Sequence, residues 1–339
     1  MAKIKRGVSF YSYQQAQFFG MRWKDMVKEL HDNLHCDGVE IINESTIPRY
    51  PFGTEEFFYD WDETMARYNM VPTVSNVFFD TLQFRDHVMS YEEGINRLKY
   101  DIRTAARMGF HMVRCLGSLP FEIYKGAVPE AEKYDVQIGR ELHVPEGMYS
   151  PLAEELIEYV DKTGCPYLKI VVDMSCFEIA TPQPNIDYAI RNADEDDKKM
   201  IEYIEKNKPD MSNDELVAGM EKDLGFGADK TFWIMHSFGH KIPSAQPEDI
   251  LHVVPYMMSM HGKFYDMTEI PGEPGHYEDK SIMYKEVIDI LKTTDWEGYI
   301  DSEFEGQRSR QDMGREGLVD EVDQVRKHHE MLKRLIGEE

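Results

Sequence analysis

Eight short apolar segments, each separated from the next by a stretch with helical spacing, constrain the fold of this 339-residue chain most strongly. Several of them are continuous apolar runs, which are typical of parallel strands covered on both faces. Alternating strands and helices favour βα units, and eight such units predict a (β/α)8 TIM barrel. The predicted strands are Gly7–Tyr11, Gly38–Ile42, Val71–Val77, Met112–Leu116, Val136–His143, Tyr167–Met174, Tyr256–Tyr265 and Gly298–Phe304.

Capping signals mark the helices between these strands. Ser90 and Glu93 form a predicted capping box, because a side-chain oxygen and a carboxylate three residues later can each accept a backbone N–H of the first turn. Ser150 and Pro151 predict another helix start, and Gly164 predicts its end. The last helix is predicted from a stripe of apolar residues: Leu318, Val322, Val325, Leu332 and Leu335.

One segment is too long for a minimal barrel. About 80 residues separate the sixth and seventh predicted strands, where a simple βα connection needs far fewer. We therefore predict a single domain, residues 1–339, with an insertion at about 176–255. Loops that follow barrel strands lie on the catalytic face, so the insertion is expected to build a lid, a substrate pocket or a partner contact there. Its charged stretch, residues 192–199, is typical of a solvated helix face.

The charge balance and the cysteines restrict the function and the location. Lys+Arg number 38 against 63 Asp+Glu, a net charge of −25, which disfavours binding to nucleic acid or to an anionic membrane surface. No apolar run approaches the roughly 20 residues of a membrane span, and the start of the chain lacks the apolar region of a signal peptide. The four cysteines have no metal-finger spacing. Free thiols in a reducing cytoplasm are therefore expected.

Polar residues able to bind a metal or move a proton stand at the ends of four predicted strands. Catalytic groups of such barrels come from these carboxyl ends. Side chains two residues apart on a strand share a face, so carboxylates and imidazoles from different strands can converge on one point. The residues are Glu141 and His143, then Asp173, then His261 and Lys263, and finally Glu303 and Glu305.

Three carboxylates and one imidazole make a mostly hard oxygen site. Such a donor set favours Mn²⁺, Mg²⁺ or Fe²⁺, with Zn²⁺ as a less favoured alternative. Any one of these residues alone could be a buried salt bridge or a hydrogen-bonded core group. Their joint occurrence at successive strand ends favours a metal site.

Four motifs resemble the xylose-isomerase-like barrels, a superfamily of sugar-phosphate isomerases, ketose 3-epimerases and inosose dehydratases. They are Glu-Leu-His at 141–143, Val-Asp at 172–173, His-Gly-Lys at 261–263 and Ser-Glu-Phe-Glu-Gly at 302–306. The resemblance implies that Glu141, Asp173, His261 and Glu303 bind one divalent metal. The chain departs from the pattern in its long insertion, and in Cys176, where several epimerases have a histidine.

A narrower resemblance is to the alpha subunits of bacterial C-glycoside deglycosidases. It rests on the opening Gly-Val-Ser-Phe-Tyr-Ser-Tyr-Gln at 7–14, the run Gln-Ile-Gly-Arg-Glu-Leu-His-Val-Pro at 137–145, and the extended sixth loop. This resemblance implies a manganese-dependent lyase that acts on 3-oxo-glucosides. It also implies a hetero-oligomer with a smaller β-sandwich β subunit.

A carbon–carbon glycosidic bond requires chemistry unlike that of ordinary glycoside hydrolases, because it has no leaving oxygen to protonate. Once the sugar is oxidised at C3, the C2 proton lies next to a carbonyl, and its removal allows the aglycone to leave from C1. A divalent metal can stabilise the negative charge on the carbonyl oxygen. His143 is the predicted base, and its alternatives are a support of the metal site or a fifth ligand.

Other residues are predicted to bind substrate or assist the reaction. Glu305 is expected to protonate the departing aglycone carbon, or to replace Glu303 as the metal ligand. Lys263 is expected to polarise a substrate oxygen or to pair with a ligand carboxylate. Further candidate sugar or aglycone contacts are His236 and His240 in the insertion, and Tyr11, Glu40 and Asn43 near earlier strand ends.

The leading hypothesis is therefore a metal-dependent lyase that cleaves the C-glycosidic bond of flavonoid-type 3-oxo-C-glucosides, as the catalytic subunit of a hetero-oligomer. A sugar isomerase or epimerase with the same metal chemistry is the alternative. A silent barrel that serves as a scaffold or carbohydrate-binding subunit is a third possibility, against which the complete ligand set argues. An endonuclease is disfavoured because it needs a basic groove.

Overall fold

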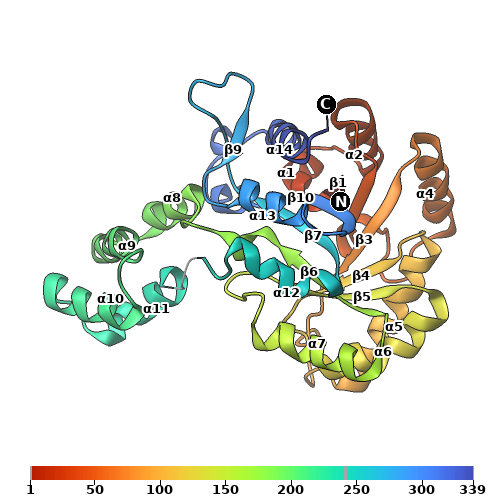
Figure 1. Ribbon diagram of the computed structural model, residues 1–339, viewed down its shortest axis with the longest axis horizontal. Helices are drawn as coiled ribbons and strands as arrows, with labels where there is room; N and C mark the ends of the chain where they lie inside the picture. The colour runs from red at the N-terminus through yellow and green to blue at the C-terminus, as the bar shows by residue number, and fades with distance from the viewer. Residues whose placement is uncertain (1, 240–242, 339) are drawn as a thin grey trace.

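The computed structural model describes residues 2–239 and 243–338, apart from the side chains of residues 228, 229, 233, 236 and 237. Within this part of the chain, parallel strands close into a barrel in the order β1-β10-β7-β6-β5-β4-β3-β2. Helices surround the strands in Figure 1, which confirms the predicted (β/α)8 TIM barrel. The barrel strands are β1 (Lys3–Ser9), β2 (Gly38–Ile42), β3 (Val71–Val77), β4 (Met112–Cys115), β5 (Gln137–Leu142), β6 (Leu168–Asp173), β7 (Met257–Phe264) and β10 (Glu297–Phe304).

The other elements connect these strands. The α-helices are α1 (Gln14–Phe18), α2 (Trp23–Glu29), α3 (Asn43–Thr46), α4 (Glu55–Tyr68), α5 (Tyr91–Arg107), α6 (Phe121–Tyr134), α7 (Pro151–Thr163), α8 (Gln183–Asn192), α9 (Glu195–Asn207), α10 (Asn213–Gly219), α11 (Ala228–Phe238), α12 (Ile250–Val253), α13 (Tyr284–Leu291) and α14 (Glu321–Ile336). Short 3₁₀ or π turns are η1 (Phe10–Tyr13), η2 (Leu30–Leu34), η3 (Met174–Phe177), η4 (Met220–Leu224), η5 (Pro247–Asp249), η6 (Val254–Tyr256), η7 (Arg308–Arg310) and η8 (Arg315–Gly317). Strands β8 (Met267–Glu269) and β9 (Tyr277–Asp279) form a small antiparallel hairpin that the apolar pattern did not predict.

The predicted barrel strands agree with the observed ones to within one residue at each end, except for the first. Strand β1 begins at Lys3, four residues before its predicted start at Gly7, and ends at Ser9. Its early residues pair with β10 although Lys3 and Lys5 are exposed and only Ile4 between them is buried. This part of β1 is therefore a half-buried alternating strand, which a search for continuous apolar runs does not find.

The predicted caps are confirmed at α5 and α7. Ser90 and Glu93 form the reciprocal capping box of α5, and the Ser150 side chain accepts the Ala153 N–H at the start of α7. Gly164 ends α7 with a φ of 69°, a left-handed conformation that glycine adopts without strain. The last helix was predicted to include Leu318, which was wrong. Asp320 is the N-cap of α14, so the helix begins at Glu321, three residues after that leucine.

Polar side chains also occupy the interior of the barrel. Asp301 of β10 is fully buried and accepts hydrogen bonds from the hydroxyls of Thr73 and Ser259. A Cβ atom on Gly7 of the neighbouring strand β1 would lie 1.9 Å from Asp301 Oδ1. Glycine is therefore required at position 7 for the carboxyl group to fit.

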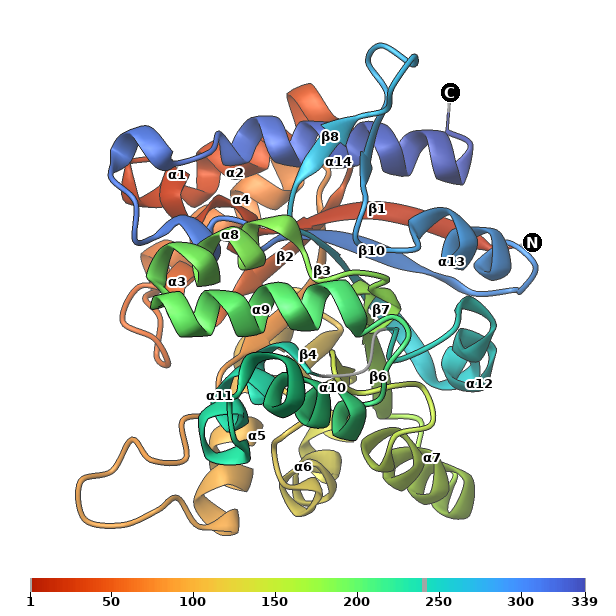
Figure 2. The ribbon, with the colours of Figure 1, turned by 90° about the vertical axis from the view of Figure 1, so that its left-hand side faces the viewer.

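The segment between β6 and β7 is the predicted insertion. Its helices α8 to α11 project to the left of the barrel in Figure 1 and lie in front of it in Figure 2. They enclose a small apolar core of their own, formed by Met200, Ile201, Ile204, Leu216, Met220 and Phe238. The charged stretch at 192–199 begins α9, as predicted, with Asp194 as the N-cap.

The insertion is attached to the loop that follows β10. Arg191 at the end of α8 donates to the Ser309 carbonyl oxygen at 2.7 Å and forms an ion pair with Asp312 at 2.9 Å. Asn192 donates to the same Asp312 carboxylate. This places the insertion beside a loop of the barrel's carboxyl face. Among the described residues, no helix combines the length and apolarity needed to cross a bilayer.

Candidate metal centre

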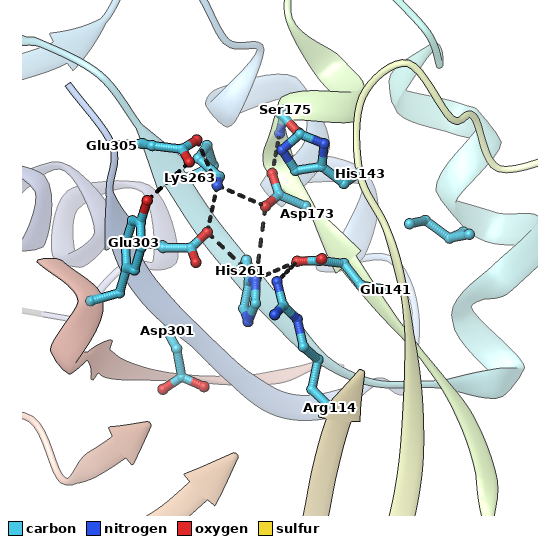
Figure 3. A network of polar contacts seen from close by, with 12 residues as sticks. Arg114, Glu141, His143, Asp173, Ser175, His261, Lys263, Asp301, Glu303 and Glu305 are labelled. Atoms are coloured by element: carbon cyan, nitrogen blue, oxygen red, sulfur yellow. Dashed lines mark hydrogen bonds and ion pairs between the residues drawn. The ribbon is translucent and has the colours of Figure 1, made fainter. Parts of the chain in front are cut away.

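The four predicted ligands come together at the carboxyl ends of adjacent strands. Glu141 lies on β5, Asp173 ends β6, His261 lies on β7 and Glu303 lies on β10, and these strands are neighbours in the barrel. All four residues are buried. Figure 3 shows their side chains pointing toward one another inside the barrel.

The Nδ1 atom of the His261 imidazole is the centre of this group. Glu141 Oε1 lies 2.7 Å from it, Glu303 Oε2 3.5 Å and Asp173 Oδ2 3.8 Å. In the described structure His261 Nδ1, Asp173 Oδ2 and Glu303 Oε2 lack a hydrogen bond of acceptable geometry, although each atom is buried. Buried polar atoms are normally satisfied, so a shared bound partner explains this convergence. Three carboxylates and one imidazole are donors that suit a hard divalent cation, and we conclude that these residues fit one.

Two buried cations pair with these carboxylates. Arg114 of β4 forms an ion pair with Glu141, and Lys263 of β7 lies 2.7 Å from Glu303 Oε2 and 3.4 Å from Asp173 Oδ2. Burial raises the pKa of Asp173, but Lys263 and His261 outweigh it and hold the pKa well below its usual range. For Glu141 burial is likewise outweighed, here by Arg114. For Glu303 burial prevails over Lys263, and the pKa is raised.

Glu305 lies further out than the four predicted ligands. It is the second carboxylate of the Ser-Glu-Phe-Glu-Gly motif at 302–306. It accepts hydrogen bonds from Lys263 Nζ at 2.9 Å, from Arg308 Nη1 at 2.7 Å and from the Tyr11 hydroxyl at 3.2 Å. Burial raises its pKa, but Lys263 and Arg308 bring it down to about 2. Burial, and then the charge of Glu305, raise the pKa of Tyr11 to about 12. Glu305 is thus a carboxylate surrounded by donors.

His143 follows β5 directly and lies beside Ser175 and Asp173 in Figure 3. Its Nδ1 is 2.6 Å from the Val144 carbonyl oxygen. A carbonyl oxygen only accepts, so Nδ1 carries a proton, and in the neutral form of the ring the lone pair is therefore on Nε2. The loop is attached to a predicted metal ligand, because Val144 N donates to Ser175 Oγ and Ser175 N donates to Asp173 Oδ1.

Glu141 and Glu303 of this group line a cavity of about 420 Å³. Its polar lining includes the predicted residues Tyr11, His143, Lys263 and Glu305. Its apolar lining consists of Phe78, Leu116, Val144, Pro145 and Leu152. The cavity therefore offers both polar and apolar contacts to a ligand.

Other predicted substrate contacts lie elsewhere. Glu40 is fully buried and bonds the other edge of the His261 ring, with its Oε2 3.0 Å from Nε2. Asn43 is also buried and accepts a hydrogen bond from the Ser75 hydroxyl. Neither lines the cavity described above. His240 and the side chain of His236 lie outside the described residues. Among the described residues of the insertion, none lines this cavity.

Sequence reasoning missed Arg114 and Arg308, which both line the cavity. Arg114 carried a signal, because a charged residue inside the short apolar strand Met112–Cys115 requires a buried partner. Arg308 carried none, since it lies in an ordinary polar loop after the last motif.

Curated relatives resemble the chain along its whole length. A C-glycoside deglycosidase alpha subunit of Arthrobacter globiformis is 25% identical, and the match covers 99% of this chain and 93% of the relative. A 3'-dehydrocarminate deglycosidase alpha subunit of a Microbacterium species is 23% identical, with 100% and 97% covered. No protein-family model matches the chain.

Solved structures share the fold. A sugar phosphate isomerase/epimerase from Parabacteroides distasonis superposes with a TM-score of 0.53 at 13% identity, covering 99% of this chain and 94% of the other. D-psicose 3-epimerase gives 0.54 at 10% identity, covering 98% and 99%. The chain thus has the fold of the xylose-isomerase-like sugar phosphate isomerases and epimerases, and in sequence it resembles the alpha subunits of C-glycoside deglycosidases from end to end.

Proposed function

We propose that this protein is a divalent-metal-dependent lyase that cleaves the C-glycosidic bond of 3-oxo-C-glucosides, as the catalytic subunit of a hetero-oligomer. The observation that carries the proposal is the convergence of three carboxylate oxygens on His261 Nδ1, beside a cavity that Glu141 and Glu303 line together with polar and apolar side chains. Relatives named as C-glycoside and 3'-dehydrocarminate deglycosidase alpha subunits support the substrate class.

Glu141, Asp173, His261 and Glu303 would hold the metal. Mn²⁺ is the ion we propose, with Mg²⁺, Fe²⁺ and Zn²⁺ as alternatives. A divalent cation supplies Lewis-acid stabilisation of negative charge that develops on a substrate oxygen. Arg114 and Lys263 keep the ligand carboxylates oriented and ionised, which prepares the site for a cation.

His143 is the proposed base. Its Nε2 lone pair takes the C2 proton of the 3-oxo sugar, which is acidic because it lies next to the C3 carbonyl. The electron pair of the broken C2–H bond forms the C1–C2 double bond, and the C1–aglycone bond breaks. The aglycone carbon leaves with the electron pair of the C1–aglycone bond and takes a proton. The hydrogen bond to Val144 holds the ring with Nε2 available for the first step.

Glu305 as the proton donor to the aglycone stays a prediction. With a pKa of about 2 the group is ionised at neutral pH, so it must receive a proton before it can donate one. The Tyr11 hydroxyl, 3.2 Å away, is a donor already in contact with it. We propose that Lys263 and Tyr11 face the sugar oxygens, while the apolar wall around Phe78 and Leu152 receives a flat aglycone.

A partner subunit is part of the proposal, because the relatives are named as alpha subunits. We propose the smaller β-sandwich subunit that the sequence resemblance implies. Large exposed apolar side chains support a partner, since they gather on loops after the neighbouring strands β10, β1, β2 and β3. Among them Phe18 is 84% and Leu82 71% exposed. The loop with Leu82 extends away from the barrel at the lower left of Figure 2.

Metal analysis and a coupled assay test the proposal. The purified chain is assayed for metal, stripped with a chelator, reloaded with Mn²⁺, and supplied with a 3-oxo-C-glucoside with and without a candidate small subunit. We expect aglycone release that disappears with the metal and returns with Mn²⁺. Turnover of free ketoses alone would instead support the sugar isomerase or epimerase alternative, and absence of metal binding would contradict both.

Two sets of variants separate the parts of the proposal. His143→Ala should retain the metal and lose most turnover, and full activity would remove His143 from the mechanism. Leu82→Glu and Phe18→Glu should weaken copurification with the small subunit. Tyr59→Glu, at a position 68% exposed on the outer helix α4, is the matched control and should not weaken it.

A further inference from the structure

The two nitrogens of the His261 ring face different environments. Nδ1 faces the carboxylates of the proposed metal site, at 2.7 to 3.8 Å. Nε2, on the opposite edge, faces only one carboxylate oxygen among the hydrogen bonds and ion pairs described, Glu40 Oε2 at 3.0 Å. A neutral imidazole has one N–H and one lone pair, so a proton on Nε2 leaves the lone pair on Nδ1.

Glu40 is placed to bond Nε2. It lies in β2, is fully buried, and does not line the substrate cavity. Glu40, His261 and Glu303 form a second combination of possible ligands. The distances favour the first combination, because Glu303 Oε2 approaches His261 at Nδ1. Glu40 therefore stands across the ring from the converging ligands.

We propose that Glu40 is a positioning residue that accepts the Nε2–H of His261 and thereby presents the Nδ1 lone pair to the metal. An ionised carboxylate cannot donate, so a 3.0 Å contact with Nε2 requires the proton to be on the ring. Ligating histidines commonly donate their second N–H to such an outer carboxylate, which fixes the ring and raises its basicity. The inference rests on the metal site of the proposed function, but the contact between the Nε2–H and Glu40 can be tested without metal.

The direct test is ¹⁵N NMR of the full chain labelled in histidine, with the His261 signals assigned by their loss in His261→Asn. The Nε2–H proton signal should lie downfield in the wild type, because Glu40 accepts this hydrogen, and on addition of Zn²⁺, a diamagnetic probe, the Nδ1 signal should shift while Nε2 stays protonated. Glu40→Leu removes the acceptor and should move the Nε2–H signal upfield. Glu40→Gln, whose amide oxygen can still accept, should keep this signal close to its wild-type position.

Calorimetric titration with Mn²⁺ supplies the second measurement. Glu40→Leu should weaken binding by about 10- to 100-fold, and Glu40→Gln by less. Asp301→Asn is the matched control, because Asp301 is equally buried in the barrel but forms neither a hydrogen bond nor an ion pair with His261 in the described structure. It should stay within about threefold of the wild type.

The results distinguish this inference from the proposed function. Wild-type affinity in Glu40→Leu, or a wild-type Nε2 that carries no proton, would overturn it. A wild type that binds no metal would contradict the proposed function, while the Nε2–H signal of the metal-free protein would still decide whether Glu40 accepts this hydrogen. If Glu40→Leu does not fold, as judged by circular dichroism, the Nε2–H signal and the Mn²⁺ affinity of Glu40→Gln decide.

Discussion

Two groups of buried carboxylates lie near the carboxyl ends of the barrel strands, and the pKa values of one member of each, Glu305 and Glu178, move in opposite directions. At the proposed metal site, Glu305 is surrounded by Lys263, Arg308 and Tyr11, and its pKa falls to about 2. Beside the β8–β9 hairpin, Glu178 accepts a hydrogen bond from the Tyr265 hydroxyl at 2.7 Å, and burial raises its pKa to about 8.

The neighbours, rather than the depth of burial, decide the direction. Burial alone penalises the charged form in both groups, and nearby cations outweigh it at Glu305 but not at Glu303. Asp279, beside Glu178, accepts from the backbone N–H groups of Tyr265 and Ser281, and burial still raises its pKa. The chain therefore maintains an ionised carboxylate at Glu305, beside the proposed metal site, and a neutral one under the hairpin.

The largest expected effect comes from replacing one carboxylate with its amide, in each group separately. Asp173→Asn removes a charged oxygen that faces His261 Nδ1, and we expect loss of the metal and a fall in turnover of roughly 10³-fold or more. Asp279→Asn is the matched variant, and it should retain metal and turnover even if its melting temperature falls. Elemental analysis and an aglycone-release assay measure both. Equal metal loss in the two variants would contradict the comparison.

Removing the cation should make the first group resemble the second. Lys263→Met leaves Asp173, Glu303 and Glu305 without their shared ammonium, so their pKa values should rise and fewer carboxylates should be ionised at neutral pH. We expect turnover to fall by about 10²-fold. Steady-state kinetics over a range of pH measures it, and wild-type kcat with an unchanged pH profile would show that Lys263 does not have this role.

The second group should affect stability through pH. The pKa of Glu178, about 8, is raised from an ordinary value of 4.5, so its contribution is complete below about pH 4.5 and is lost as the pH rises through 8. The free energy of unfolding should therefore fall by a few kcal/mol across this window. Urea unfolding at pH 5 and pH 8 measures it. Glu178→Gln stays neutral and should flatten the dependence, and an equally steep slope in that variant would locate the effect elsewhere.

The smallest expected effect concerns the single hydroxyl that supports Glu178. Tyr265→Phe removes one neutral hydrogen bond and should lower the free energy of unfolding by about 1 kcal/mol. Turnover should stay within about twofold, because the phenol lies outside the cavity above the proposed metal site. A large loss of turnover would mean that the two groups act together.

The sequence allowed prediction of the barrel and of the residues that converge at its carboxyl end. Strands buried on both faces appear as apolar runs, and their carboxyl ends must meet at one face, so Glu141, Asp173, His261 and Glu303 could be grouped without coordinates. The half-exposed start of β1 and the short hairpin strands were missed, because neither contains a continuous apolar run.

The contact partners of individual side chains around the site could not be predicted. Glu40 was expected to contact sugar, yet in the structure it bonds His261, which lies 221 residues further along the chain. Which edge of a ring faces which carboxylate depends on the register of β2, β7 and β10 across the closed barrel. No local pattern encodes that register, and the same holds for the pairing of Arg114 with Glu141.

The attachment of the insertion to the loop after β10 defines a unit for exchange between related enzymes. Arg191 and Asn192 hold residues 309–312 in place, and Arg308, immediately before them, contacts Glu305 at the wall of the cavity. If the helices α8 to α11 were exchanged without this loop, the contacts between Arg191 and the loop would be lost. Arg308 would then lose the anchor beside it. Residues 183–192 and 308–312 should therefore be transplanted together, although more than a hundred positions separate them in the chain.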